Sequence, residues 1–217
     1  RDARVSKARV MRALADVRQY ATGSAPIWSN ALEAVRTMVD QTSQEPAYVD
    51  RAMELAELTL TVAEGLADRA RRTGDGNSLK EAESALALHA RIAGEPAESL
   101  VQRSRLPGKL ELARAAVRKT ETRAQTLARM DEALKAQQPL AVYSQRDHLV
   151  ALYSDLAEDR AVIDRLLKAN ELIRLAARFD ASSRAAEHGL LPDPLGPPLT
   201  LVLRDPAPTG SSPAPAP

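Results

Sequence analysis

Histidine is the side chain best suited to moving protons near neutral pH, and this chain has three, His89, His148 and His188. They lie in different segments, and none belongs to an HExxH, HxxxH or ExxH pattern that would place two ligands on one helix face. His148 directly follows Asp147, but neighbours in a helix point to different faces, so the two are not preset as an acid and a base. We therefore expect no metal-binding residues and no histidine-based catalysis.

Carboxylates are the second group that could do chemistry, and they cluster at Asp131 and Glu132 and at Asp155, Glu158 and Asp159. A catalytic carboxylate needs a shaped pocket that raises its pKa, and the sequence has no sign of one. Asp159 has the position of an N-cap for a following helix. A nucleophile elbow and the GxxxxGK[ST] and GxGxxG phosphate loops are also missing from the sequence. We expect a protein that is not an enzyme and binds no cofactor.

Basic residues recur along one segment: Lys109, Arg114, Arg118, Lys119 and Arg123. Arg114 and Arg118 lie one helical turn apart and have the spacing to bind phosphate, but Glu111 and Glu121 share that side. Aromatic residues, which would stack on bases, make up only 3% of the chain. Nucleic-acid binding is therefore not expected.

Composition sets the limits for the fold. The 217 residues are enough for one ordinary domain, and the net charge of +1 predicts no particular class of partner. Cysteine is absent, which removes disulfides and thiolate metal sites without fixing the compartment. No run approaches the roughly 18 apolar residues of a membrane span. Since the sequence begins at Arg1, we expect that a leader, an anchor or another domain can precede it.

Proline and glycine divide the chain into about seven expected helices. Five prolines, at positions 26, 46, 96, 107 and 139, fall where helical periodicity restarts. Ser24 is the expected cap of the second helix, Asn77 or Ser78 that of the fourth with Glu81 completing a capping box, and DGN is expected to be a turn. The expected helices cover residues 3–21, 27–41, 47–72, 78–94, 109–137, 140–156 and 160–179.

These helices predict an all-α fold of about seven helices in antiparallel hairpins, because short connections make consecutive helices antiparallel neighbours. The sequence leaves open an α-solenoid or an irregular helical bundle. Unequal helix lengths and the lack of a clean 34-residue period favour the bundle. We expect a helical domain over 1–180 and an extended tail or linker, rich in Pro, Ala and Ser, over 181–217.

One segment, LKEAESALALHARIAGEPAE, resembles the second helix of a tetratricopeptide repeat. Ala82 stands at the small position, Leu86 at the large apolar position, and a proline, Pro96, follows the helix. His89 departs from the family at its second small position, and the Trp, Leu, Gly and Tyr pattern of the first helix is missing. The resemblance covers one hairpin and implies a ligand-binding or scaffolding array, with no ligand residues carried over.

Few aromatic residues are available to line a partner groove, and the candidates are Trp28, Tyr48, Tyr143 and Tyr153. Packing in the core is the competing interpretation for all four. Asn170 is a polar residue on the apolar side of the last expected helix, where it would fix helix register or reach a neighbouring backbone.

The end of the chain differs from the rest, since nine of its 14 prolines lie from Pro192 onward. Within it, PLTLVLRD alternates in polarity, and Pro197, Pro198 and Pro206 limit it to a short strand over 199–204 or an extended segment. Such a segment either covers a groove between helices or begins a β-domain beyond a Pro/Ala spacer. A disordered terminus is the ordinary alternative, but we favour the spacer, because Pro/Ala linkers hold modules apart.

The sequence predicts a non-catalytic module for protein-protein interaction or scaffolding, belonging to a larger or tethered protein, with a protein or peptide as its partner. The alternatives are a helical spacer without a specific ligand, or an accessory domain of an enzyme that lies elsewhere in a longer chain. Alanine-rich helices, a Pro/Ala/Ser tether and the lack of cysteine favour the bacterial cell envelope or periplasm, although the compartment stays unknown. Oligomeric state is not encoded in any pattern that we recognise.

Overall fold

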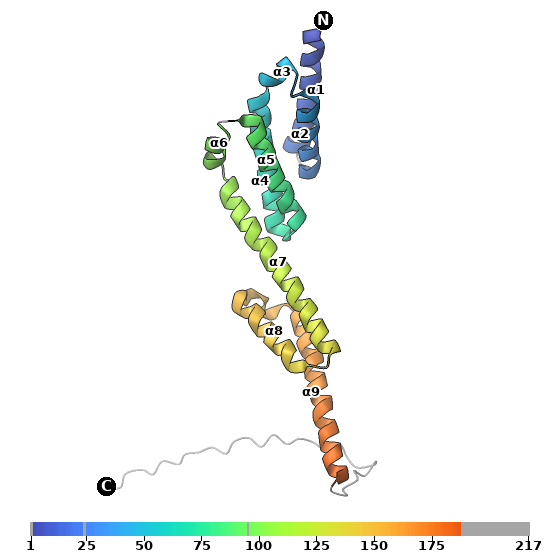
Figure 1. The fold of residues 1–217 in the computed structure, drawn as a ribbon. Coiled ribbons are helices and arrows are strands. Elements are labelled where there is room, and N and C mark those ends of the chain that lie inside the picture. Colours follow the sequence, from blue (N-terminus) through green and yellow to red (C-terminus); the bar gives the residue numbers. More distant parts are fainter. Residues whose placement is uncertain (1, 24, 95, 188–217) are drawn as a thin grey trace, which may run out of the picture. The chain divides into compact units, whose positions relative to one another are not determined.

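The computed structural model describes residues 2–23, 25–94 and 96–187, and over these residues the protein is helical, with no strand (Figure 1). The all-α prediction is confirmed. The described residues form nine α-helices and one 3₁₀ helix: α1 (Asp2–Thr22), α2 (Trp28–Thr42), α3 (Pro46–Val49), α4 (Ala52–Thr73), α5 (Gly76–Ala93), α6 (Ala97–Arg103), α7 (Leu106–Lys135), α8 (Pro139–Leu152), η1 (Ser154–Glu158) and α9 (Arg160–Glu187).

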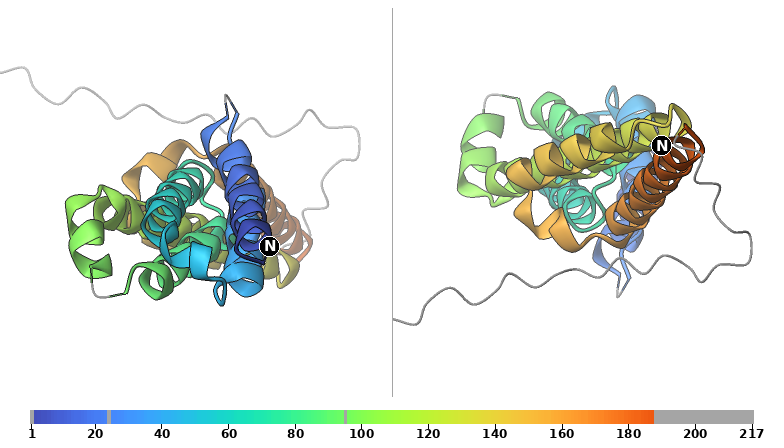
Figure 2. Two further views of the ribbon diagram at one scale, coloured as in Figure 1. Left: turned by 90° about the horizontal axis from the view of Figure 1, so that it is seen from above. Right: turned by 90° about the horizontal axis from the view of Figure 1, so that it is seen from below.

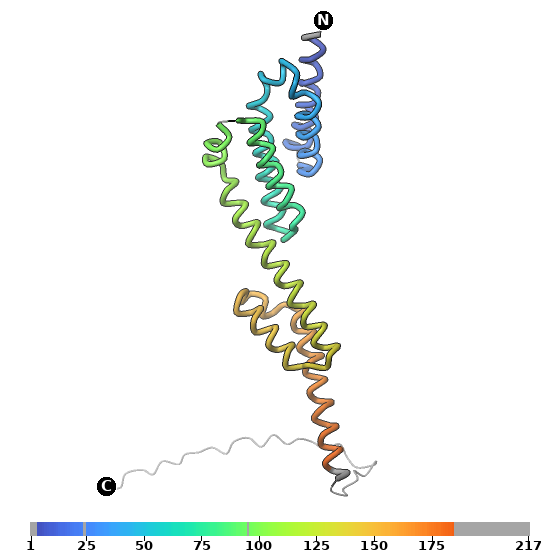
Figure 3. The backbone as a smooth tube through the Cα atoms, in the orientation of Figure 1, coloured from blue at the N-terminus to red at the C-terminus, as the bar shows by residue number. Residues whose placement is uncertain are grey.

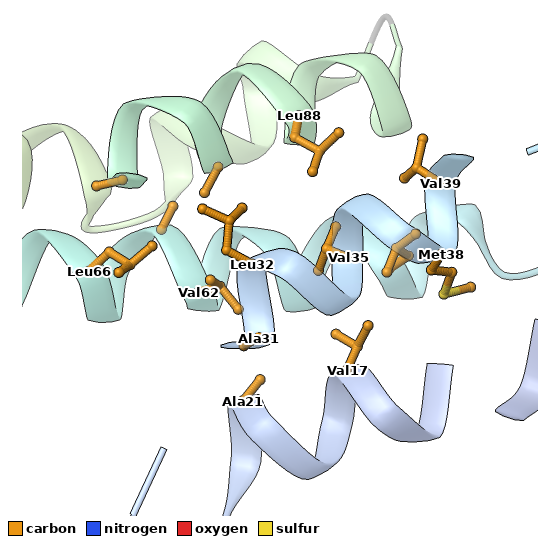
Figure 4. Close-up of a cluster of buried hydrophobic side chains, with 14 of the residues drawn as sticks. Val17, Ala21, Ala31, Leu32, Val35, Met38, Val39, Val62, Leu66 and Leu88 are labelled. Atoms are coloured by element: carbon orange, nitrogen blue, oxygen red, sulfur yellow. The ribbon is translucent and has the colours of Figure 1, made fainter. Parts of the chain in front are cut away.

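A first hydrophobic cluster joins α1, α2, α4 and α5, which pack side by side when seen end-on (Figure 2). Each helix contributes residues three or four apart, the spacing that places apolar side chains on one face. On α1 these are Val10, Leu14, Val17 and Ala21, all buried as the periodicity predicts. In Figure 4, Val17 and Ala21 face Ala31 and Val35 of α2, and Leu32 lies between Val62 and Leu88. The cluster is built from aliphatic side chains and alanine, as the low aromatic content requires.

The hairpin of α4 and α5 is the most closely packed pair, and the chain reverses between them in a few residues (Figure 3). Gly74 ends α4 with a left-handed φ of 66°, and its N–H donates to the Ala70 carbonyl. Asp75 is the N-cap of α5, because its carboxylate accepts hydrogen bonds from the N–H groups of Asn77 and Ser78, each 3.0 Å long. The expected cap at Asn77 or Ser78 is therefore wrong, and the expected DGN turn lies partly inside α5.

The ends of other helices also differ from those expected from the sequence. The helix expected over 47–72 is interrupted at Asp50 and Arg51, where a turn separates α3 from α4. This turn accompanies the burial of Tyr48 in the first cluster and an ion pair of 2.6 Å between Arg9 of α1 and Glu45. Helix α2 has Ile27 as its N-cap residue, whereas the expected cap Ser24 lies outside the described residues. Tertiary contacts, which local periodicity does not report, decide these ends.

Helix α7 belongs to two hydrophobic clusters. Near its start, Leu106 and Leu110 pack in the first cluster. Near its end, Met130 and Ala133 pack with Val142 and Leu149 of α8 and with Leu156 of η1, forming a second cluster that Val162 and Ala169 of α9 complete. The helices expected from 109 and from 140 are thus confirmed, with α7 starting at Leu106 and α8 ending at Leu152.

Helix α9 runs to Glu187, so the expected end near Phe179 is wrong. Residues from Asn170 onward form a separate unit of the chain. The predicted tail over 181–217 therefore begins inside α9, and its remainder from residue 188, including the expected strand at 199–204, lies outside the described residues. Among the described helices, none is both long enough and apolar enough to span a membrane.

Candidate protein-binding groove

A groove of about 690 Å³ lies between α5 and α6. This volume falls in the range of about 300–1,000 Å³ that ligand pockets in proteins occupy. Small and aliphatic side chains form most of its lining, and the polar members are Glu83, His89, Glu98 and Gln102. The apolar lining residues are Leu86, Ala87, Ala90, Gly94, Ala97 and Val101.

The groove forms because α5 ends and the chain turns before α6 begins. Gly94 ends α5 with a φ of 63°, a left-handed conformation that glycine adopts at no steric cost. Pro96, which cannot continue a helix, is the N-cap residue of α6. A small cluster of Ala56, Ala93 and Ala97 then holds α6 against α4 and α5. Alanines at these three positions bring the helices close while leaving the outer faces of α5 and α6 uncovered.

His89 lines the groove and carries an unsatisfied acceptor. Its side chain is fully buried, and Nδ1 lies 2.9 Å from the carbonyl oxygen of Ala56. A carbonyl only accepts, so Nδ1 is the donor and Nε2 of the neutral ring carries the lone pair. Nε2 is buried and has no hydrogen-bond partner among the described residues. A buried acceptor without a donor costs about 1–3 kcal/mol, so a ligand that donates to Nε2 recovers that free energy.

The edge of the groove is acidic. Glu83 accepts two hydrogen bonds from Arg114 of α7, of 3.2 and 2.8 Å, and its charge is thereby compensated. Glu98 is exposed and, among the described residues, accepts only a hydrogen bond of 3.3 Å from the Gln102 amide. The groove therefore presents one uncompensated carboxylate beside an apolar floor, which favours a cationic group on a ligand.

The four aromatic residues proposed for a partner groove occupy two different clusters. Trp28 packs against the first cluster, over Gly65, and Tyr48 is buried in it, where desolvation raises the pKa of its phenol. Tyr143 and Tyr153 pack against the second cluster, and Lys119 lies 6.0 Å from the centre of the Tyr153 ring. The structure gives these residues packing contacts and does not bring the four together.

Four of the five basic residues singled out on α7 are engaged with carboxylates of neighbouring elements. Lys109 lies 2.9 Å from both Glu64 and Asp68 of α4, and these two carboxylates raise its pKa against the effect of partial burial. Lys119 pairs with Asp155 of η1. With Arg114 on Glu83, these cations tie α7 to its neighbours, whereas Arg118 is exposed and makes no ion pair among the described residues.

Arg123 makes the most complete of these pairs. Its Nε and Nη2 atoms donate to the two carboxylate oxygens of Asp159, at 2.6 and 3.0 Å. Asp159 also accepts from the N–H groups of Ala161 and Val162, which confirms it as the N-cap of α9. Hydrogen bonds from Arg123 and from these backbone groups hold the pKa of Asp159 below its usual range. This carboxylate therefore acts as a structural cap and is not available as a general acid near neutral pH.

The remaining candidates for chemistry do not converge. His148 and Asp147 are exposed on α8, with Asp147 paired to Arg146 at 2.9 Å, and Asp131 is paired to Arg165 at 2.6 Å. His188 lies outside the described residues. Over the described ranges, no group of three His, Asp or Glu residues is placed to hold a metal ion.

Sequence reasoning missed the groove, although the segment with the tetratricopeptide-like pattern supplies most of its lining. The signal was the run of alanines at 82, 85, 87 and 90, of which the first two are buried and the last two are exposed. His89, which departs from the tetratricopeptide pattern, forms the polar floor of the groove. No family model, curated protein or solved structure compared with the chain matches it.

Proposed function

We propose that this chain is a non-catalytic protein-interaction module that binds an apolar segment of a protein partner in the groove between α5 and α6. The observation that carries the proposal is the combination of an open apolar lining with the unpaired, buried Nε2 of His89. Buried polar groups are usually hydrogen-bonded, so an acceptor without a donor beneath an apolar lining supports the binding of a ligand there.

The lining defines the chemistry of the partner. Leu86, Ala90 and Val101 form an apolar surface for one or two large aliphatic or aromatic side chains. A hydrogen-bond donor carried by such a side chain, such as an indole N–H or a phenol, would satisfy Nε2 of His89. A lysine or arginine close to this anchor would compensate Glu98. The proposed ligand is therefore an apolar, weakly basic peptide segment.

Two further features support a protein rather than a nucleic acid as the partner. Of the five basic residues that could contact phosphates, Lys109, Arg114, Lys119 and Arg123 are already paired with carboxylates, which leaves Arg118. The resemblance to tetratricopeptide repeats in the segment that forms α5 also implies binding of a peptide or a scaffolding role.

The test is a selection of binders from a random peptide library on the chain, compared with two tryptophan variants. Ala90→Trp fills the groove, whereas Ala115→Trp adds the same side chain at an exposed position of α7 that does not line it. We expect enriched peptides that combine an aromatic or aliphatic anchor with Lys or Arg. They should bind the chain and Ala115→Trp equally and lose at least tenfold in affinity for Ala90→Trp.

A second variant separates the hydrogen bond from the shape of the groove. His89→Leu keeps an apolar group of similar size and removes the Nε2 acceptor, so peptides with a Trp or Tyr anchor should lose more affinity than peptides with a Leu or Phe anchor. Circular dichroism checks that each variant is folded. Selection that enriches no sequence above background, or peptides that bind Ala90→Trp as tightly as the unmodified chain, would favour a helical spacer instead.

A further inference from the structure

The second half of α9 carries an apolar stripe that the described residues do not cover. Leu172, Leu175 and Phe179 are spaced three and four residues apart, so they lie on one face of the helix, with Ala176 beside them. Leu175 is 59% exposed and Phe179 is 74% exposed, while Leu172 is half-buried. Glu171 and Arg178 border the stripe.

We propose that the apolar segment of residues 199–203, LTLVL, folds back and binds along this stripe of α9. The segment follows α9 in the chain, and only residues 188–198 lie between the two. It is independent of the α5–α6 groove, so this inference does not rest on the proposed function.

Chain length permits the contact. Eleven residues, 188–198, separate α9 from the segment and can span up to about 36 Å when extended. Along the helix axis, Glu187 is about 12 Å from Phe179 and about 22 Å from Leu172, at 1.5 Å per residue. The connection is therefore long enough to return without being fully stretched, and its tethering gives the segment a high effective concentration.

The spacing of the side chains in the segment also matches the length of the stripe on α9. In an extended segment alternate side chains share a face, so Leu199, Leu201 and Leu203 would face the helix over about 13 Å. The stripe from Leu172 to Phe179 is about 10.5 Å long. Pro197, Pro198 and Pro206 prevent the segment from joining a longer helix or a central strand, which leaves side-chain packing as its means of attachment.

A second copy of the chain fits the stripe less well. Large side chains bury at most about 150–250 Å² each, so three of them give less than the roughly 800 Å² per partner of a stable interface. A tethered segment does not need that area, because its binding does not lose the translational freedom of two separate molecules.

The test compares two neighbouring substitutions in the full chain, Leu201→Asp and Val202→Asp. Both add the same charge, but only residue 201 would face α9, since adjacent residues of an extended segment point to opposite sides. We expect Leu201→Asp to accelerate amide exchange at residues 172–179 at least fivefold and Val202→Asp to change it less than twofold. Equal exchange in the two variants and the unmodified chain would overturn the proposal.

A crosslink identifies the occupant of the stripe. Since the chain has no cysteine, Ala176→Cys combined with Leu203→Cys allows only one disulfide within a single chain. We expect mild oxidation to give a monomer whose disulfide joins residues 176 and 203. Oxidation to a covalent dimer, with exchange at 172–179 that depends on protein concentration, would mean that a second copy covers the stripe and would overturn the proposal.

Discussion

At the scale of single residues, the structure depends on positions where a small or a charged side chain has one specific neighbour. Gly65 is such a position, because a Cβ there would lie 2.3 Å from Cε2 of Trp28. Asp159 is another, since it receives two donors from Arg123 and two from the backbone of α9. The first position concerns shape and the second concerns charge, and each gives a separate prediction.

Gly65→Ala should destabilise the chain by about 1–3 kcal/mol, because Trp28 must leave its place on α4. Alanine is a better helix former than glycine, so helix propensity alone would make Gly65→Ala stabilising. We expect the opposite effect on stability, because the clash with Trp28 is larger. Gly108→Ala is the control, since no atom lies within 4 Å of a Cβ at that position, and it should be neutral or stabilising. Urea unfolding followed by the fluorescence of Trp28, the only tryptophan, checks both variants. Unchanged emission and stability in Gly65→Ala would contradict the described packing of Trp28.

Asp159→Asn should cost about 1 kcal/mol at pH 6, because asparagine still caps α9 but loses the charged pair with Arg123, itself screened by partial exposure. The pKa of Asp159 is held below its usual range. Its contribution is therefore full above an unfolded pKa of about 3.9 and is lost as the pH falls through the lower folded pKa. The stability difference between the chain and the variant, measured by urea unfolding from pH 6 to pH 2.5, should shrink with acidity. A difference that does not change with pH would show that the ion pair contributes nothing.

At the scale of elements, the hairpin of α4 and α5 depends on Gly74, which combines a left-handed φ with a close approach to α7. A Cβ at this position would lie 2.0 Å from Oγ1 of Thr120. Gly94 has a similar φ of 63° and nothing within 4 Å of a Cβ, but its ψ of −137° differs from the ψ of 22° at Gly74.

Gly94→Ala should destabilise the chain through backbone conformation alone, and Gly74→Ala should cost more than the about 1–2 kcal/mol of a left-handed residue, because it adds a clash with Thr120. Combining Gly74→Ala with Thr120→Ala should recover the excess. Thermal unfolding of the two single variants, Thr120→Ala and the double variant measures this coupling. If Gly74→Ala costs as much with Thr120→Ala as without it, the contact between the hairpin and α7 is not as described.

The sequence predicts these elements well where the deciding residues are neighbours along the chain. The faces of α1 and α2 and the Asp159 cap follow from spacings of two to four residues. The break at Asp50 and Arg51 did not follow, because the burial of Tyr48 is decided by packing against residues far along the chain. The groove was missed for the same reason: His89 bonds to Ala56, 33 residues earlier, and no local pattern reports that contact.

At the scale of the molecule, two hydrophobic clusters share only α7. Leu66 is fully buried in the first cluster and Leu149 in the second. The cations of α7 pair with carboxylates beside both clusters, Lys109 with α4 and Arg123 with the cap of α9. The stability of each cluster therefore depends mainly on its own side chains.

Leu149→Ala should cost about 2–5 kcal/mol in the second cluster through lost burial and a cavity. Native-state hydrogen exchange should then speed up in α8 and at the start of α9, while α2 and α4 keep their protection. Leu66→Ala is the reciprocal variant and should loosen α2, α4 and α5 instead. Equal acceleration throughout the described helices in both variants would show a single cooperative unit.

The central claim is that the groove between α5 and α6 binds a protein partner. The most direct measurement is hydrogen exchange of the chain with and without a saturating selected peptide. We predict slower exchange at residues 83–102, with His89 and α6 most protected, no change in α8, and no protection in Ala90→Trp under the same conditions. Protection confined to other helices, or identical protection in Ala90→Trp, would contradict the claim.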